Sequence, residues 1–329
     1  MRTRRELIAG AGALAAAAPA LALAANAVAA PKLGGKTALI TGASSGFGKL
    51  AALLLARSGA TVIASMRNYD GGKRAEAQEL ADLASKEKLK LSVVEIDVTK
   101  PGTIGSGVAA ALTKAKGKLD LLMNNAGVGV GGPIEFNDER SVMEAFDVNL
   151  LGYHRMARAV LPSMRKRREG LIVSVSSQLG RIVVPNIGVY CATKFGVEAM
   201  FETLAYELAP FGVEVTIVQP GGYPTKIWEN GRRLADAVTA RADEERKAAY
   251  AGHNQMAQGL MNGQYETDPM DVPRAIAEIL ALPPGKRPLR RPVHPNTQGS
   301  SAANAAMAQI EAGVLSSGPY KDWHAAVVD

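Results

Sequence analysis

The 329-residue sequence is poor in the residues that build disulfides and metal centres. It has a single cysteine, Cys191, and four histidines. One cysteine cannot form an intramolecular disulfide or a cysteine-rich metal site. The scattered histidines show none of the spacings of zinc ligands, so the sequence predicts no metal site.

Charges of one sign are not gathered into a block. The net charge is +7, but the Lys and Arg residues are interspersed with Asp and Glu. This pattern argues against nucleic acid as a partner, because such binding needs a basic patch or stripe. Hydrophobic residues make up 47% of the chain, which is sufficient for a buried core in one large α/β domain or two smaller ones.

The N-terminus resembles a twin-arginine export signal. Arg4 and Arg5 precede Leu7 and Ile8, and an Ala-rich, moderately apolar segment with small residues at its end follows. We expect residues 1–29 to be removed as a signal peptide, leaving an exported or periplasmic protein without stable membrane insertion. The alternatives are an uncleaved membrane anchor and a cytoplasmic protein with a disordered extension.

The rest of the chain, residues 30–329, is interpreted as one α/β domain, because apolar β-branched runs alternate with longer amphipathic stretches. This alternation indicates a parallel sheet. The expected strands are 37–40, 61–64, 91–96, 119–123, 171–175 and 213–218, with a seventh possible at 289–293. The expected helices lie near 47–58, 73–87, 102–115, 138–167 and 188–209. Residues 223–270 are interpreted as a helical lid, and a C-terminal extension after about residue 285 contains a helix near 301–313.

A glycine-rich turn directly follows the first expected strand and opens the first helix: Thr41-Gly42-Ala43-Ser44-Ser45-Gly46-Phe47-Gly48. Glycine lets a backbone approach a pyrophosphate closely, and a helix N-terminus supplies unsatisfied N–H groups. The position of the turn therefore predicts dinucleotide binding. The alternative is that these glycines form tight corners or helix caps without a ligand.

Further motifs follow in order along the chain: Asn124-Asn125-Ala126-Gly127, Asn149, Ser177, Tyr190-Cys191-Ala192-Thr193-Lys194, and Pro220-Gly221 with Thr225. Together with the glycine turn they resemble the short-chain dehydrogenase/reductase family across residues 36–225. The resemblance implies a Rossmann-type doubly wound parallel seven-stranded sheet with helices on both faces. It also implies an oxidoreductase acting on CH–OH groups with NAD(P), and a homodimer or homotetramer that pairs the helices at 138–167 and 188–209.

Tyr190 and Lys194 are four residues apart, so on a helix both side chains project from one face. A nearby ammonium favours the phenolate and is expected to bring the pKa of Tyr190 towards the working range of an acid/base. The resemblance implies that Ser177 hydrogen-bonds the substrate oxygen, that Lys194 also holds the nicotinamide ribose, and that Asn149 supports a proton path behind Lys194. No histidine is placed to activate Cys191, which is interpreted as a packing residue.

The cofactor preference is predicted from the end of the second strand. NAD sites place Asp or Glu there, but this stretch ends in Arg67 and has no carboxylate before Asp70. Arg67 can pair with a 2′-phosphate and Ser45 can donate to it, so NADP(H) is favoured over NAD(H), unless Arg67 is simply solvated. The remaining cofactor-binding residues that the family pattern implies are Gly42, Ser44, Gly46, Phe47, Gly48, Asp97, Val98, Asn125, Ala126, Gly127, Tyr190, Lys194, Pro220, Gly221 and Thr225. The asparagine pair can equally be internal strand bracing.

The segment after Thr225 mixes charges with apolar residues such as Trp228 and Tyr265. We interpret it as a mobile lid over an apolar pocket and expect a hydrophobic carbonyl or alcohol, such as a steroid-like, retinoid-like or aryl ketone. A subunit interface would explain the same residues. Two alternatives to a simple oxidoreductase stay open, a dinucleotide-dependent epimerase or dehydratase and a non-catalytic nucleotide-binding sensor.

Overall fold

The computed structural model describes residues 31–261 and 265–328, so the expected signal peptide lies outside the described residues. Seven strands form one sheet in the order β3-β2-β1-β4-β5-β6-β7, and every neighbouring pair is parallel. The strands are β1 (Thr37–Ile40), β2 (Thr61–Met66), β3 (Leu91–Glu95), β4 (Leu121–Asn124), β5 (Gly170–Val175), β6 (Val213–Pro220) and β7 (Arg290–Val293). The predicted doubly wound seven-stranded sheet is confirmed.

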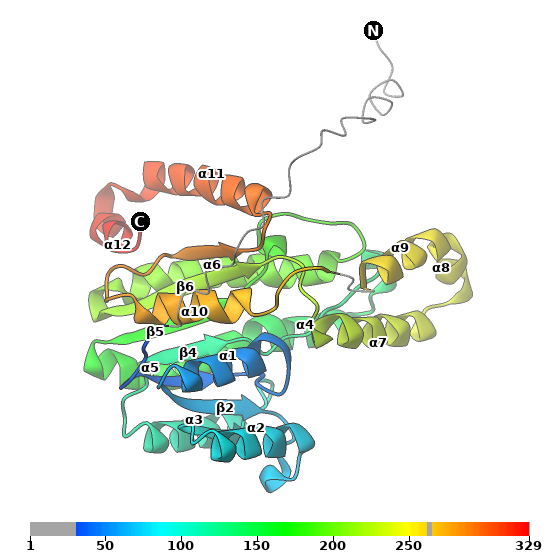
Figure 1. Cartoon of the computed structure of the whole chain (residues 1–329). Coiled ribbons are helices and arrows are strands. Elements are labelled where there is room, and N and C mark those ends of the chain that lie inside the picture. The colour runs from blue at the N-terminus through cyan, green and yellow to red at the C-terminus, as the bar shows by residue number, and fades with distance from the viewer. Residues whose placement is uncertain (1–30, 262–264, 329) are drawn as a thin grey trace, which may run out of the picture.

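Helices cover both faces of this sheet (Figure 1). They are α1 (Gly46–Arg57), α2 (Ala75–Lys86), α3 (Pro101–Lys114), α4 (Glu139–Phe146), α5 (Gly152–Arg167), α6 (Gly188–Leu208), α7 (Lys226–Arg241), α8 (Glu244–Ala249), α9 (Ala251–Met261), α10 (Asp271–Ala281), α11 (Gln298–Leu315) and α12 (Lys321–Ala325). Along β1, Ala38 and Ile40 pack into the core under α1, α2 and α10, whereas Leu39 packs into the core under α3, α5 and α6. Both faces are buried, which explains the continuous apolar runs of the strands.

The expected long helix at 138–167 is interrupted in the structure. A π-helical turn at Asp147–Leu151 separates α4 from α5. Such turns shift the helical hydrogen-bond register by one residue and often occur at functional sites. The interruption holds Asn149 with its side chain turned into the protein, where it is fully buried.

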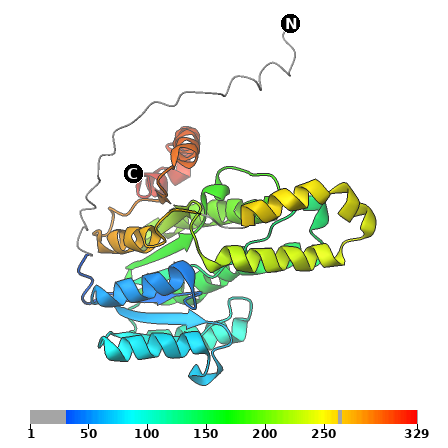
Figure 2. The same cartoon turned by 45° about the vertical axis from the view of Figure 1, so that its right-hand side comes forward.

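Within the described part of the segment 223–270, α7, α8 and α9 project beyond the carboxyl ends of the strands (Figure 2). Several contacts hold this helical unit, hereafter the lid, to the segment around α4, and two of them are short hydrogen-bonded pairs. Arg241 at the end of α7 binds Asp138 with nitrogen–oxygen distances of 2.6 and 3.0 Å, and the Tyr250 hydroxyl donates to Glu135 at 2.6 Å. No helix among residues 31–261 and 265–328 combines the length and the apolar character needed to cross a membrane.

Polar contacts attach α11 to the protein near β7. Asn304 accepts a hydrogen bond from Arg181 at 3.0 Å and donates to Gln219 at 2.7 Å. Two helical turns further along, burial and the neighbouring Glu202 raise the pKa of Glu311 to about 7. The protonation state of this carboxyl group in the C-terminal extension therefore changes near neutral pH.

Candidate active site

A cavity of about 650 Å³ lies at the carboxyl ends of the strands. This volume is typical of small-molecule and cofactor sites, which range from roughly 300 to 1,000 Å³. All but two of the residues predicted for the site line it: Gly42, Ser44, Ser45, Gly46, Phe47, Arg67, Asp97, Val98, Asn125, Ala126, Gly127, Ser177, Tyr190, Lys194, Pro220, Gly221 and Thr225. The two exceptions are Gly48 and Asn149, so the structure brings the separate motifs to one place and sets these two behind the cavity.

Two of the three glycines in the β1–α1 turn are required by contacts within the protein. Gly42 has a φ of +67°, and a Cβ there would lie 2.8 Å from the Cα of Ala126. A Cβ on Gly48 would lie 2.5 Å from the Gly42 carbonyl oxygen and from the Asn125 amide. Only Gly46, with a φ of +53°, leaves ordinary space beside it. The close approach expected for a pyrophosphate therefore applies to Gly46, whereas Gly42 and Gly48 permit the turn to pack on β4.

Asn125 braces the same turn. Its side-chain amide donates to the carbonyl oxygens of Thr41 at 2.9 Å and Gly42 at 3.3 Å. The Thr41 hydroxyl in return accepts from the backbone N–H groups of Asn125 and Ala126, at 2.9 and 3.1 Å. The alternative reading of the asparagine as an internal brace is thus correct for its side chain, while the residue also borders the cavity.

The end of the cavity beside β2 carries two charged residues that sequence reasoning missed. Arg74 donates to the Arg67 carbonyl oxygen at 2.6 Å, and its guanidinium binds the Glu76 carboxylate at 2.9 and 3.2 Å. This pairing lowers the pKa of Glu76 to about 2. Arg67 itself is exposed at the rim of the cavity. Because Arg74 and Glu76 lie beyond the strand in an irregular stretch and at the start of α2, strand-end spacing gave no signal for them.

The arrangement fits a dinucleotide. The first N–H groups of α1 have no acceptor within the helix, and they begin at Gly46 on the cavity wall. Arg67 borders the cavity at the end of β2, Asp97 and Val98 follow β3, and Tyr190 lies on α6. The cavity thus connects a place for an anionic diphosphate with the half-buried phenol of Tyr190.

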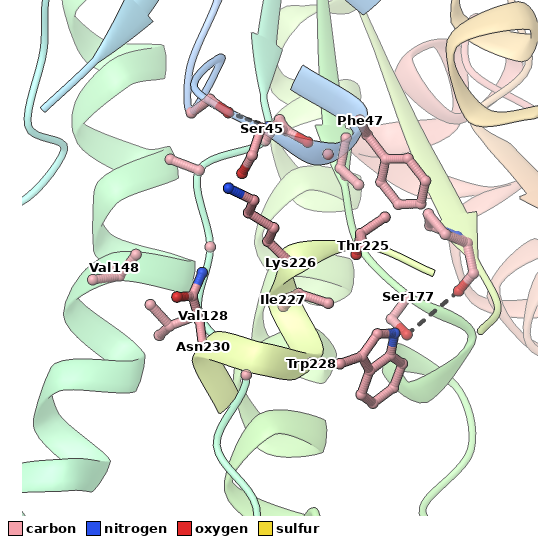
Figure 3. Close-up of a pocket in the computed structure, with 18 of the residues that line it drawn as sticks. Ser45, Phe47, Val128, Val148, Ser177, Thr225, Lys226, Ile227, Trp228 and Asn230 are labelled. Carbon is pink, nitrogen blue, oxygen red and sulfur yellow. Dashed lines mark hydrogen bonds between the residues drawn. The ribbon is translucent and has the colours of Figure 1, made fainter. Parts of the chain in front are cut away.

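Tyr190 and Lys194 project from α6 towards Ser177, which follows β5. The Lys194 ammonium is buried, donates to the Val175 carbonyl oxygen at 2.8 Å and lies 5.6 Å from the centre of the Tyr190 ring. The Ser177 hydroxyl donates to the Pro220 carbonyl oxygen at 3.4 Å (Figure 3). Three of the four predicted catalytic side chains therefore share one corner of the cavity, and Asn149 does not line it.

Burial dominates the protonation of this corner. It lowers the pKa of Lys194 to about 7, against the opposing charge of Glu198. It raises the pKa of Tyr190 to about 12, although the Ser177 hydroxyl acts in the other direction. The direction for Tyr190 is opposite to the one expected from its spacing to Lys194, because the cost of removing the phenolate from water outweighs the hydrogen bond with Ser177.

Asn149 acts behind the cavity. Its side chain accepts from the Val128 N–H at 2.8 Å, donates to the Val128 carbonyl oxygen at 2.9 Å and donates to the Thr193 hydroxyl at 3.1 Å. It thereby fixes the segment after β4 against α6, which makes it a positioning residue. Cys191 is 2% exposed and packs with Ile187, and burial raises the pKa of its thiol. Both facts agree with its interpretation as a packing residue.

Apolar and aromatic side chains gather where the cavity passes Ser177. Those lining it are Leu179, Val184, Ile187, Trp228 and Tyr265. The Trp228 indole donates to the Tyr223 carbonyl oxygen at 2.6 Å, and its ring centre lies 5.1 Å from that of Tyr265. The lid thus contributes an aromatic wall beside the corner that contains Ser177, Tyr190 and Lys194.

Comparison with known proteins agrees with this geometry. The family model described as short chain dehydrogenase matches residues 36–234, and the chain belongs to this family. A 3-ketodihydrosphingosine reductase of Bacteroides thetaiotaomicron is 38% identical, with 62% of this chain and 70% of the relative covered. Human retinol dehydrogenase 8 is 35% identical over 78% of this chain and 80% of its own.

The solved structures include similar molecules. A short chain dehydrogenase/reductase from Burkholderia phymatum in complex with NAD has a TM-score of 0.68 and 28% identity, covering 86% of this chain and 96% of the other. Fold, site and family together define the chain as an NAD(P)-dependent oxidoreductase that acts on CH–OH groups.

Proposed function

We propose that the protein interconverts a hydrophobic ketone or aldehyde and the corresponding alcohol with NADP(H), and that Tyr190 is the acid/base. The observation that carries this proposal is the meeting of Ser177, Tyr190 and Lys194 in one cavity with the β1–α1 turn. NADP(H) is preferred in this proposal because Arg67 lies exposed at the rim of the cavity, where it can pair with the 2′-phosphate.

The bound nicotinamide supplies or accepts the hydride. In the direction of reduction, Ser177 holds the substrate oxygen and Tyr190 donates its proton to that oxygen. A pKa of about 12 keeps the phenol protonated at neutral pH, which suits a proton donor. Lys194 lies over the ring of Tyr190 and is placed to replace the proton, while Asn149 keeps α6 in register with the segment after β4.

The cofactor preference rests on Arg67 and its surroundings. The relative from Burkholderia phymatum carries NAD, so membership of the family does not decide the preference. Arg74 is bound to Glu76, which leaves Arg67 as the cation best placed to pair with a 2′-phosphate. We expect Arg67→Met to weaken NADPH binding about tenfold and to leave NADH binding unchanged, as measured by calorimetric titration. Equal affinities of the unmodified protein for the two nucleotides would refute the preference.

The hydrophobic substrate is supported by the side chains beside Ser177 and by two relatives. The cavity wall there is apolar or aromatic, including Leu179, Ile187 and Trp228. Two relatives are named 3-ketodihydrosphingosine reductase and retinol dehydrogenase 8, and the compounds in these names are long and apolar. We therefore expect larger apolar ketones to be turned over with a lower KM than sugars or short ketones.

The test of the function uses purified residues 30–329 and follows NADPH oxidation against a panel of ketones and aldehydes. Tyr190→Phe is the paired variant, and we expect it to lower turnover by about 10²- to 10⁴-fold while retaining nucleotide binding. Retained turnover in this variant would exclude Tyr190 as the acid/base. Failure of the unmodified protein to bind either NADPH or NADH would exclude the enzymatic function.

We also propose that residues 1–29 direct export and that the folded protein is a homodimer or homotetramer. The support for export is the pair Arg4 and Arg5 before an apolar segment. The N-terminal sequence of protein from fractionated cells tests cleavage, and light scattering tests the subunit number. An intact N-terminus on cytoplasmic protein would refute export, and a monomer at working concentration would refute assembly.

A further inference from the structure

Lys226 is the first residue of the lid helix α7, and it directly follows Thr225, which borders the cofactor end of the cavity. Its side chain is exposed and lines the cavity. Figure 3 shows it extending from α7 towards Ser45 in the β1–α1 turn. The lysine of one cavity wall thus faces the proposed diphosphate-binding turn of the opposite wall.

The charge of Lys226 acts within the cavity. It contributes to lowering the pKa of Glu76, which lies on α2 beyond β2 and is held directly by Arg74. Lys226 acts on this carboxylate through space, whereas Arg74 binds it by two hydrogen bonds. The ammonium therefore lies within electrostatic reach of the groove between the two walls and is directed at it.

We propose that Lys226 binds the diphosphate of the nicotinamide dinucleotide from the lid side. An ammonium is a compact cation with three donors, and it stabilises phosphate oxygens through charge-assisted hydrogen bonds. The β1–α1 turn then contacts the diphosphate from one side and Lys226 from the other. This inference rests on the proposed function, because it requires a dinucleotide in the cavity.

A consequence for the substrate end follows from the geometry of α7. Trp228 lies two residues after Lys226, and Figure 3 shows its indole beside Ser177. Lys226 and Trp228 belong to the same helical turn, so a diphosphate that fixes Lys226 also fixes the aromatic wall of the substrate end. Nucleotide binding thereby positions the lid for the substrate.

The experiment measures nucleotide binding rather than turnover. The sequence has two tryptophans, Trp228 and Trp323, so Trp323→Phe leaves Trp228 as the only one. Quenching of its fluorescence by NADPH and by NADH, which accept energy from indole, gives the two Kd values. We compare this protein with the same protein carrying Lys226→Met, and use Lys247→Met as the matched control because Lys247 lies on α8 away from the cavity.

We expect Lys226→Met to weaken binding of NADPH and NADH by the same factor, about tenfold, since both contain the diphosphate. The Kd of this variant should also depend less on salt than that of the background protein, because one ion pair is missing. Lys247→Met should leave both Kd values unchanged.

Two results would overturn the assignment. If Lys226→Met weakened the binding of NADPH alone, Lys226 would contact the 2′-phosphate and not the diphosphate. If the Kd values of both nucleotides were unchanged, Lys226 would not contact the cofactor. Either result leaves the proposed function standing if the background protein still binds NADPH. If the background protein bound neither nucleotide, the proposed function and the inference would both be overturned. This outcome differs from the two above, in which the background protein still binds NADPH.

Discussion

Replacement of Lys194 by methionine should change how the stability of the protein depends on pH. Burial lowers the pKa of Lys194 from 10.5 to about 7. Between these values the unfolded chain binds a proton that the folded protein does not, so the free energy of unfolding rises with pH. Methionine has no proton to bind, and its variant lacks this contribution.

The magnitude follows from the two pKa values. A full difference of one proton changes the free energy of unfolding by about 1.4 kcal/mol per pH unit, which gives about 2–3 kcal/mol between pH 7.5 and 9.5. The variant should be more stable than the unmodified protein at pH 7.5, and this advantage should shrink by that amount at pH 9.5. Loss of the hydrogen bond to the Val175 carbonyl oxygen leaves that acceptor satisfied, because the Tyr153 hydroxyl also donates to it at 3.1 Å.

Urea unfolding of the nucleotide-free protein at pH 7.5, 8.5 and 9.5 measures the difference. The matched control is Lys86→Met, since Lys86 is exposed in the last turn of α2 and should retain the pH dependence of the unmodified protein. If Lys194→Met and the unmodified protein showed parallel pH dependences, the ammonium of Lys194 would not be desolvated as the structure indicates, and the reasoning would be wrong.

Three further outcomes can be measured. Gly48→Ala should lower the free energy of unfolding by about 1–3 kcal/mol in urea, because its Cβ would collide with the Gly42 carbonyl oxygen; an unchanged value would contradict the packing of the turn. Arg241→Ala should speed proteolytic cleavage within the lid while changing global stability by less than about 1 kcal/mol, because it releases an exposed pair with Asp138; unaltered cleavage would show that this contact does not hold the lid. Because the pKa of Glu311 is raised, its contribution to stability is present at acidic pH and is lost as the pH rises to about 7. Glu311→Gln should therefore reduce the fall in the free energy of unfolding between pH 5 and 7.5. The same fall in the variant and the unmodified protein would refute the raised pKa.

Much of the fold could be predicted from the sequence because its signals are local. The apolar runs identified β1 to β6 to within a few residues, since parallel strands buried on both faces are composed mainly of apolar residues. The four-residue spacing of Tyr190 and Lys194 placed them on one helical face in the same way. The π-helical turn at Asp147–Leu151 has no such signal, because its hydrogen bonds depend on where Asn149 finds partners after β4 and on α6.

The site was less predictable wherever it depends on how elements face one another. The direction of the pKa shift of Tyr190 follows from desolvation of its hydroxyl group in the folded protein, which spacing along α6 does not reveal. Arg74 and Glu76 reach the cavity only because the irregular chain after β2 turns back over it. The direction of Lys226 across the cavity is set by the path of α7, and no local pattern determines that path.

The β1–α1 turn shows what a glycine motif can and cannot report. A Cβ on Gly42 would collide with the backbone of Ala126, and one on Gly48 would collide with the Gly42 carbonyl oxygen and the Asn125 amide, so contacts within the protein set the shape of the turn. Preorganisation of this kind spares the ligand the entropy of ordering a loop. A chain of this fold without the chemistry would still need both glycines, so the motif reports how β1, α1 and the segment after β4 fit together and does not by itself report a reaction.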